Sequence, residues 1–212
     1  MLHHFDNFCK HKKLVLNELN HVLMEEENIN SGVGLIVVDL QESLLSGISN
    51  KDELLKSVEL LIRGIKLFEI PIVVSEQVPE KLGSTENIIR SALVDSKIFP
   101  KKSFSIFGSQ SIRAEIEKLG LSHLILTGIE SPICIYLSAL DALKRGYEVT
   151  ILSDCIGSRR IKDEKVAIDK LKDAGCHIIP MESFLYGFMT TSEHPNFREV
   201  SKLVRERNIT KY

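Results

Sequence analysis

The chain has 212 residues, of which 43% are hydrophobic and 26% are charged, a composition typical of a globular protein with a sizeable core. This length suits one domain, with or without an extension. The formal net charge is −2, and Lys and Arg form no dense stripe along the sequence, so the charge pattern excludes an evident nucleic-acid partner.

The sequence favours a cytoplasmic location over a membrane or secretory one. No apolar run approaches the roughly 20 residues needed to span a bilayer, and residues 1–15 contain His, Asp and Lys, unlike a secretory signal. The cysteines are widely spaced without a CxxC pair, which predicts free thiols in a reducing compartment; they are Cys9, Cys134, Cys155 and Cys176.

Residues 1–29 predict a helical extension that is separate from the main domain. Leucine and valine recur there at roughly helical intervals, and Asn30-Ser31-Gly32 interrupts the pattern. We expect this helix to pack on the main domain, residues 30–212, or on a neighbouring subunit.

From residue 33 onward, short apolar runs alternate with longer amphipathic ones. The expected strands are Gly34–Asp39, Ile70–Ser75, Ile98–Pro100, His123–Thr127, Glu148–Leu152 and Cys176–Ile179. The expected helices are about Lys51–Phe68, Thr85–Leu93, Ser109–Leu119, Pro132–Arg145, Asp163–Ala174 and Pro195–Arg207. Because the strongest strands are almost continuously apolar, both faces of the sheet should be covered. The sequence therefore predicts an α/β fold: a three-layer αβα sandwich with a central, mostly parallel six-stranded sheet.

Three chemically capable residues follow or end strands of this predicted sheet. Asp39 ends the first strand, Lys101 follows the third, and Cys134 follows the fourth. In parallel α/β sheets the carboxyl ends of the strands share an edge, where ligands bind. We expect a carboxylate, an ammonium and a thiol to meet there, although each also has a structural interpretation: Asp39 as a turn acid, Lys101 or Lys102 as a surface charge, and Cys134 as a core residue.

The surroundings of Cys134 predict a reactive thiol. Ser131 is placed to cap a helix whose first residue is Pro132, so the Cys134 sulfur would lie near unpaired amides at the positive end of that helix. This environment would lower the thiol pKa and favour the nucleophilic thiolate. Cys155 has no comparable proline or cap after it and is interpreted as structural.

No metal or cofactor is predicted. The seven histidines are dispersed without an HxH or HExxH pattern, and His123 and His177 are at strand starts, away from the edge that Cys134 occupies. Gly32-x-Gly34 precedes its strand, whereas a dinucleotide fingerprint follows one. There is also no Walker loop and no Gly-x-Ser-x-Gly elbow.

The three strand-end segments resemble the motifs of the isochorismatase-like cysteine hydrolases. These segments are Val38-Asp39-Leu40-Gln41, Pro100-Lys101-Lys102-Ser103-Phe104-Ser105 and Gly128-Ile129-Glu130-Ser131-Pro132-Ile133-Cys134. Further runs resemble the subgroup of isochorismatase domain-containing proteins: Pro71-Ile72-Val73-Val74-Ser75-Glu76-Gln77-Val78-Pro79, Leu82-Gly83-Ser84-Thr85, Asp154-Cys155 with Ser158-Arg159, and His194-Pro195-x-Phe197. The resemblance covers roughly residues 33–205.

The resemblance implies an Asp-Lys-Cys triad of Asp39, Lys101 and Cys134. Lys101 is preferred to Lys102 because the subgroup has Pro-Lys-x-x-Phe-Ser spacing. A cis peptide is implied between Ile129 and Glu130, with the amides of Glu130 and Cys134 forming an oxyanion hole.

Family nicotinamidases carry a metal-binding Asp-x-His segment between the first two motifs. This chain has Glu76-Gln77 there, which argues against metal-dependent nicotinamidase activity. Isochorismatases proper lack the nucleophilic cysteine, so the presence of Cys134 argues against vinyl-ether hydrolysis of isochorismate and for acyl transfer. Gln41 and Gln77 are candidates for hydrogen bonds to substrate, or are structural polar residues.

The expected function is hydrolysis of a small amide or related acyl compound through a Cys134 thioester. The alternatives are a catalytically silent binding or interaction protein with the same fold, and a redox-sensing thiol. The expected partners are a small-molecule substrate and, from the resemblance, further copies of the chain in a homo-oligomer.

Overall fold

The computed structural model describes residues 32–94 and 96–207. The extension predicted for residues 1–29 lies outside them. The described chain folds around a single sheet whose strand pairs are all parallel, as the alternation of strands and helices predicts.

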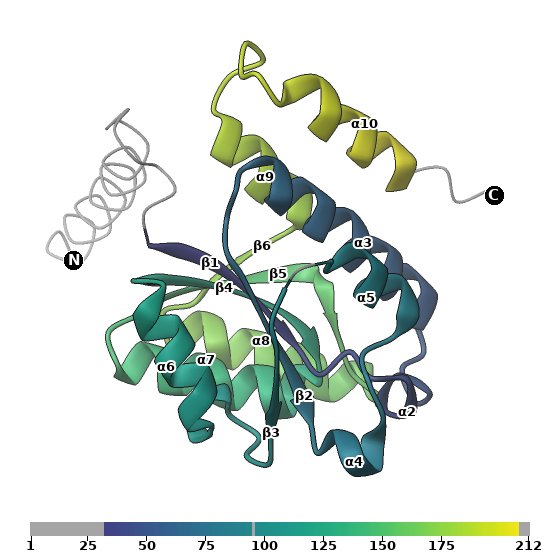
Figure 1. Ribbon diagram of the computed structural model, residues 1–212, viewed down its shortest axis with the longest axis vertical. Helices are drawn as coiled ribbons and strands as arrows, with labels where there is room; N and C mark the ends of the chain where they lie inside the picture. Colours follow the sequence, from purple (N-terminus) through teal and green to yellow (C-terminus); the bar gives the residue numbers. More distant parts are fainter. Residues whose placement is uncertain (1–31, 95, 208–212) are drawn as a thin grey trace, which may run out of the picture. The chain divides into compact units, whose positions relative to one another are not determined.

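The sheet has the predicted six strands. They are β1 (Val33–Val38), β2 (Ile72–Gln77), β3 (Ile98–Lys101), β4 (His123–Ile129), β5 (Glu148–Gly157) and β6 (His177–Ile179). Their order across the sheet is β3-β2-β1-β4-β5-β6. The chain therefore winds outward from β1 in one direction and then returns to β4 on its other side (Figure 1).

Helices cover both faces of the sheet, which confirms the three-layer prediction (Figure 1). One face carries α3 (Lys51–Leu67), α5 (Asn87–Ala92), α9 (Met181–Met189) and α10 (Phe197–Arg207). The other carries α6 (Gln110–Lys118), α7 (Tyr136–Lys144) and α8 (Ile161–Asp173). The shorter segments α2 (Glu42–Leu45), α4 (Pro79–Leu82) and η1 (Ile106–Gly108) lie in connections.

The almost continuously apolar strands supply two separate cores. In β1, Leu35 and Val37 pack into the core beneath α3, whereas Ile36 and Val38 pack into the core beneath α6 and α7. All four side chains are fully buried. Since successive side chains of a strand point to opposite faces, a strand covered on both sides buries apolar residues at successive positions.

Strand β5 and helix α9 differ from the sequence prediction. Strand β5 continues past Leu152 to Gly157, and its pairing with β4 shifts register between Leu126 and Gly128. Helix α9 was not predicted, because its sequence is apolar on most sides, follows Pro180 and contains Gly187, so the face it buries does not stand out in the sequence.

The strand order defines the edge of the sheet at which folds of this kind bind ligands. Beyond the carboxyl ends of β1 and β4 the connecting segments leave in opposite directions, because the strand order reverses between these two neighbours. Asp39 follows β1 directly, and the segment that contains Cys134 follows β4. The two residues therefore flank the switch point of the sheet.

Candidate active site

Asp39 lies at the carboxyl end of β1 with its side chain fully buried. Its backbone has a positive φ of 54°, and its amide donates to the carbonyl of Ser75 at 3.1 Å. One carboxylate oxygen, Oδ1, accepts from the Ser75 hydroxyl at 2.8 Å, and the other, Oδ2, accepts from Nζ of Lys101 at 2.6 Å. The turn after β1 thus directs the Asp39 carboxylate into the protein, where Ser75 and Lys101 both donate hydrogen bonds to it.

Lys101 is the last residue of β3, and its side chain is also fully buried. Besides Asp39, its ammonium donates to Oε1 of Gln77 at 2.6 Å and to the carbonyls of Ser103 and Phe104 at 3.1 and 3.2 Å. Lys102 is exposed. The structure therefore brings Lys101, and not its neighbour, to Asp39.

The segment after β4 turns sharply toward the site. Gly128 has a φ of 114°, and the peptide bond between Ile129 and Glu130 is cis, at the position that the resemblance implied. A π-helical turn, η2 (Ser131–Ile135), follows and leads into α7. Just before this turn, the Glu130 carboxylate forms an ion pair with Arg159.

The predicted helix cap at Ser131 is wrong. The Ser131 hydroxyl lies 3.0 Å from the carbonyl of Gly157 and 2.9 Å from Oε2 of Glu164, so it binds β5 and α8 instead of the helix amides. The regular helix α7 begins only at Tyr136, after Cys134. Cys134 is consequently part of the π-helical turn and not of the first turn of an α-helix.

Cys134 joins the same buried group. Its Sγ lies 3.8 Å from Nζ of Lys101, and the residue is 7% exposed. Burial and the negative charge of Asp39 raise the pKa of the Cys134 thiol to about 12, although Lys101 and a backbone hydrogen bond with Glu130 act to lower it. The expected lowering of this pKa is therefore wrong: removal from water and the neighbouring carboxylate outweigh the ammonium and the peptide dipoles. At neutral pH the resting sulfur carries its proton.

The two glutamines that were candidates for substrate binding make hydrogen bonds within the protein. Both Nε2 hydrogens of Gln41 are used, by the carbonyls of Gln77 at 3.0 Å and Gly83 at 2.6 Å. Oε1 of Gln77 accepts from Lys101, and Nε2 of Gln77 donates to the carbonyl of Lys102 at 2.9 Å. Gln41 is fully buried and Gln77 is 9% exposed, and the side-chain amide of each is engaged within the protein.

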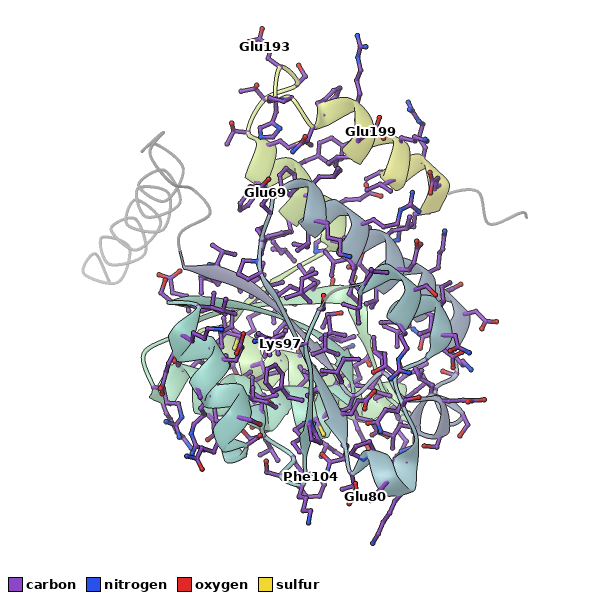
Figure 2. The ribbon with its side chains drawn as sticks, in the orientation of Figure 1. Glu69, Glu80, Lys97, Phe104, Glu193 and Glu199 are labelled. Atoms are coloured by element: carbon purple, nitrogen blue, oxygen red, sulfur yellow. The ribbon has the colours of Figure 1, made fainter. Side chains whose placement is uncertain are left out.

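Sequence reasoning missed the Ser75 hydroxyl and the two main-chain carbonyls that receive Lys101. Ser75 had a signal, since it is a polar residue near the end of an apolar strand whose carboxyl end borders that of β1. The carbonyls of Ser103 and Phe104 had none, because any residue carries a carbonyl. Phe104 is 57% exposed and lies at the edge where β3 ends, while Glu69 lies at the opposite end of β2 (Figure 2).

Two further properties concern the described residues alone. Within residues 32–94 and 96–207, no group of three or more His, Cys, Asp or Glu side chains is arranged to hold a metal ion. None of the helices described is long and apolar enough to cross a membrane.

The family model described as "Isochorismatase domain" matches residues 33–183. The chain belongs to the isochorismatase family. Isochorismatase domain-containing protein 1 of Danio rerio is 34% identical over 168 residues, which are 79% of this chain and 59% of that protein. This chain thus spans less than two thirds of the length of that curated relative.

Solved isochorismatase-like structures share the fold. The MAR1 ribonuclease of Caenorhabditis elegans has a TM-score of 0.78 and 31% identity, covering 83% of this chain and 91% of its own. The YcaC gene product of Escherichia coli, an octameric hydrolase of unknown specificity, has a TM-score of 0.70 over 85% of this chain and 95% of its own. At 18% identity, the second likeness concerns the fold alone. The family model and the curated relative place the chain among the isochorismatase domain-containing proteins, and the solved structures show the shared fold.

Proposed function

We propose that this protein is a cysteine hydrolase that cleaves a small, uncharged amide or related acyl compound through a thioester on Cys134. The observation that carries the proposal is the meeting of three side chains. Nζ of Lys101 lies 2.6 Å from Oδ2 of Asp39 and 3.8 Å from Sγ of Cys134. A thiol with a carboxylate and an ammonium beside it has both a proton acceptor and a charge partner for covalent catalysis.

In the first half of the reaction Asp39 acts as the general base. Because the thiol pKa is about 12, the proton must leave the sulfur as the sulfur attacks. Asp39 takes that proton, Sγ bonds to the carbonyl carbon, and backbone amides of Glu130 and Cys134 stabilise the oxyanion. The C–N bond then breaks, Asp39 gives its proton to the leaving amine, and a thioester remains.

In the second half, water attacks the thioester carbon and Asp39 takes its proton. The C–S bond breaks, the carboxylic acid leaves, and the sulfur regains a proton from Asp39. Lys101 keeps its charge throughout and compensates the carboxylate or the sulfur, whichever is negative. Its four oxygen partners support this charge-holding role over one as a proton donor.

The charge balance of the site favours an uncharged substrate. Asp39 and Lys101 already pair with each other, and the Cys134 thiol is neutral. An anionic substrate would have to compete with Asp39 for the ammonium, at the cost of leaving a buried carboxylate without its partner. One relative is named a ribonuclease, but RNA cleavage by this chain has no comparable support, because a protein with a net charge of −2 does not favour binding a polyanion.

Alkylation with iodoacetamide tests the thiol chemistry, with Cys176 as the internal control. Cys176 is buried to nearly the same extent as Cys134, 5% against 7% exposed, and its thiol pKa is raised by burial to about 11, below the value of about 12 for Cys134, so on pKa alone it should react faster than Cys134. We expect peptide mapping to find Cys134 labelled faster. We expect Asp39→Asn to slow Cys134 by tenfold or more without affecting Cys176, because losing the base that takes the thiol proton outweighs the lower thiol pKa that follows from losing the carboxylate charge. Equal labelling of the two cysteines, unaffected by Asp39→Asn, would favour the silent binding protein.

A substrate screen completes the same experiment. Release of ammonia or amine from a panel of uncharged small amides is measured with the wild type and with Cys134→Ala, and a single-stranded RNA is included as a separate substrate. We expect amide turnover that Cys134→Ala abolishes. RNA cleavage that survives Cys134→Ala would contradict the proposal.

A further inference from the structure

Gln77 links the catalytic lysine to the neighbouring strand. It is the last residue of β2 and lies opposite Lys101 in the parallel pairing of β2 with β3. Its Oε1 accepts from Nζ of Lys101 at 2.6 Å, and its Nε2 donates to the carbonyl of Lys102 at 2.9 Å. Both ends of this amide group are thereby engaged on the β3 side of the site.

The backbone of Gln77 is held in turn by Gln41. Oε1 of Gln41 accepts from the Gln77 amide at 2.6 Å, and Nε2 of Gln41 donates to the Gln77 carbonyl at 3.0 Å. Gln41 follows Asp39 by two residues, so the same chain segment that supplies the carboxylate also fixes the glutamine. The position of Gln77 relative to Asp39 is therefore set by two side-chain hydrogen bonds.

The Lys101 ammonium depends on its acceptors for direction. A lysine side chain has a flexible four-carbon stem and three rotatable donors, so packing alone does not orient its charge. The two shortest contacts, each 2.6 Å, go to the side chains of Asp39 and Gln77, whereas the main-chain carbonyls lie at 3.1 and 3.2 Å. Of these two closest acceptors of the ammonium, Asp39 is charged and Gln77 is neutral.

We propose that Gln77 is the positioning residue of this site: it holds the Lys101 ammonium between Asp39 and Cys134 with an uncharged acceptor, so that Asp39 remains the one carboxylate on that ammonium. The inference rests on the proposed function, and Gln77 acts through Lys101. A carboxylate at the same position would share the ammonium with Asp39 and weaken its effect on the sulfur. The neutral charge of residue 77 is thus as important as its hydrogen bond.

Gln77→Glu tests the charge, with Gln110→Glu as the matched control. Gln110 is the exposed first residue of α6 and is not among the groups that contact the Lys101 ammonium, so the control makes the same change in net charge without adding a carboxylate to that ammonium. The rate of Cys134 alkylation by iodoacetamide is measured from pH 6 to 9. For Gln77→Glu we expect the rising curve to move about one pH unit or more to higher pH, which is about tenfold slower labelling at fixed pH. Gln110→Glu should match the wild type.

The outcomes separate this inference from the proposed function. If Asp39→Asn slows labelling but Gln77→Glu coincides with Gln110→Glu, the role of Gln77 is overturned and the proposed function remains. If Asp39→Asn has no effect, the proposed function fails, and the role of Gln77 fails with it.

A second variant covers the case in which Gln77→Glu does not fold. The ammonium signal of Lys101, assigned by its loss in Lys101→Arg, is followed in ¹⁵N-lysine-labelled protein by NMR. In Gln77→Ala we expect faster exchange of the ammonium hydrogens with water, and in Gln110→Ala no change. An unchanged Lys101 signal in Gln77→Ala would overturn the inference.

Discussion

At the scale of single residues, the Asp39–Lys101 pair combines two charges that are fully removed from water. Both side chains are inaccessible, and their contact of 2.6 Å is supported by the Ser75 hydroxyl and by Oε1 of Gln77. A buried ion pair gains little over an apolar pair of the same size, because desolvation offsets the attraction. Its presence at the carboxyl ends of β1 and β3 is therefore better explained by chemistry than by stability.

A double-mutant cycle tests this argument through stability. Asp39→Asn and Lys101→Met each leave one buried charge without its partner, and each should lower the free energy of unfolding by about 3–5 kcal/mol. Asparagine tolerates the positive φ of residue 39, so backbone strain does not enter. The double variant should lose clearly less than the sum of the two, as measured by urea denaturation. Simple additivity would mean that the two charges do not interact.

At the scale of elements, the strand ends could be predicted because they depend on local patterns. An apolar run followed by a polar residue marks where a parallel strand leaves the sheet, and Asp39, Lys101 and Cys134 all followed such runs. Helix α9 could not be found in this way, since its burial against α3 and β5 depends on long-range packing. The direction of the shift in the Cys134 pKa failed for the same reason: it depends on the depth of burial and on Asp39, which is distant in sequence.

The spacing of β1 and β4 at the site depends on Gly128. Its φ of 114° is one that side chains rarely adopt, and a Cβ there would overlap the carbonyl of Val38 in the neighbouring strand. We expect Gly128→Ala to lower the free energy of unfolding by about 3 kcal/mol or more, because it adds a steric clash to backbone strain. It should also slow Cys134 alkylation by displacing the turn that follows.

Gly146→Ala is the matched control for that prediction. Gly146 has a φ of 84°, but a Cβ there would meet nothing within 4 Å. It therefore isolates the conformational cost, about 1–2 kcal/mol, from the clash. Thermal or urea unfolding of both variants gives the comparison, and equal losses would show that β1 and β4 do not constrain residue 128.

At the scale of the whole molecule, the two cores bury thiols on both faces of the sheet. Cys155 belongs to the core beneath α3, and Cys134 and Cys176 belong to the core beneath α7. Burial is the largest cause of the raised pKa of each of these thiols. The fold as a whole therefore favours the protonated form of its described cysteines. Its free energy of unfolding should consequently fall at alkaline pH.

The sign of this linkage follows from the direction of the shifts. The unfolded chain releases a thiol proton near pH 9.0, whereas folded Cys176 retains it up to about pH 11. Above pH 9 the unfolded state binds fewer protons, so this contribution to stability is complete below pH 9 and is lost as the pH rises toward 11.

Between pH 8 and 10 the loss from Cys176 should be about 1.4 kcal/mol. Urea unfolding under reducing conditions should therefore find that Cys176→Ala loses that much less stability than the wild type over this interval, because titrating tyrosines and lysines are common to both proteins. Identical slopes in the two proteins would mean that the Cys176 thiol titrates in the folded state as it does in the unfolded chain.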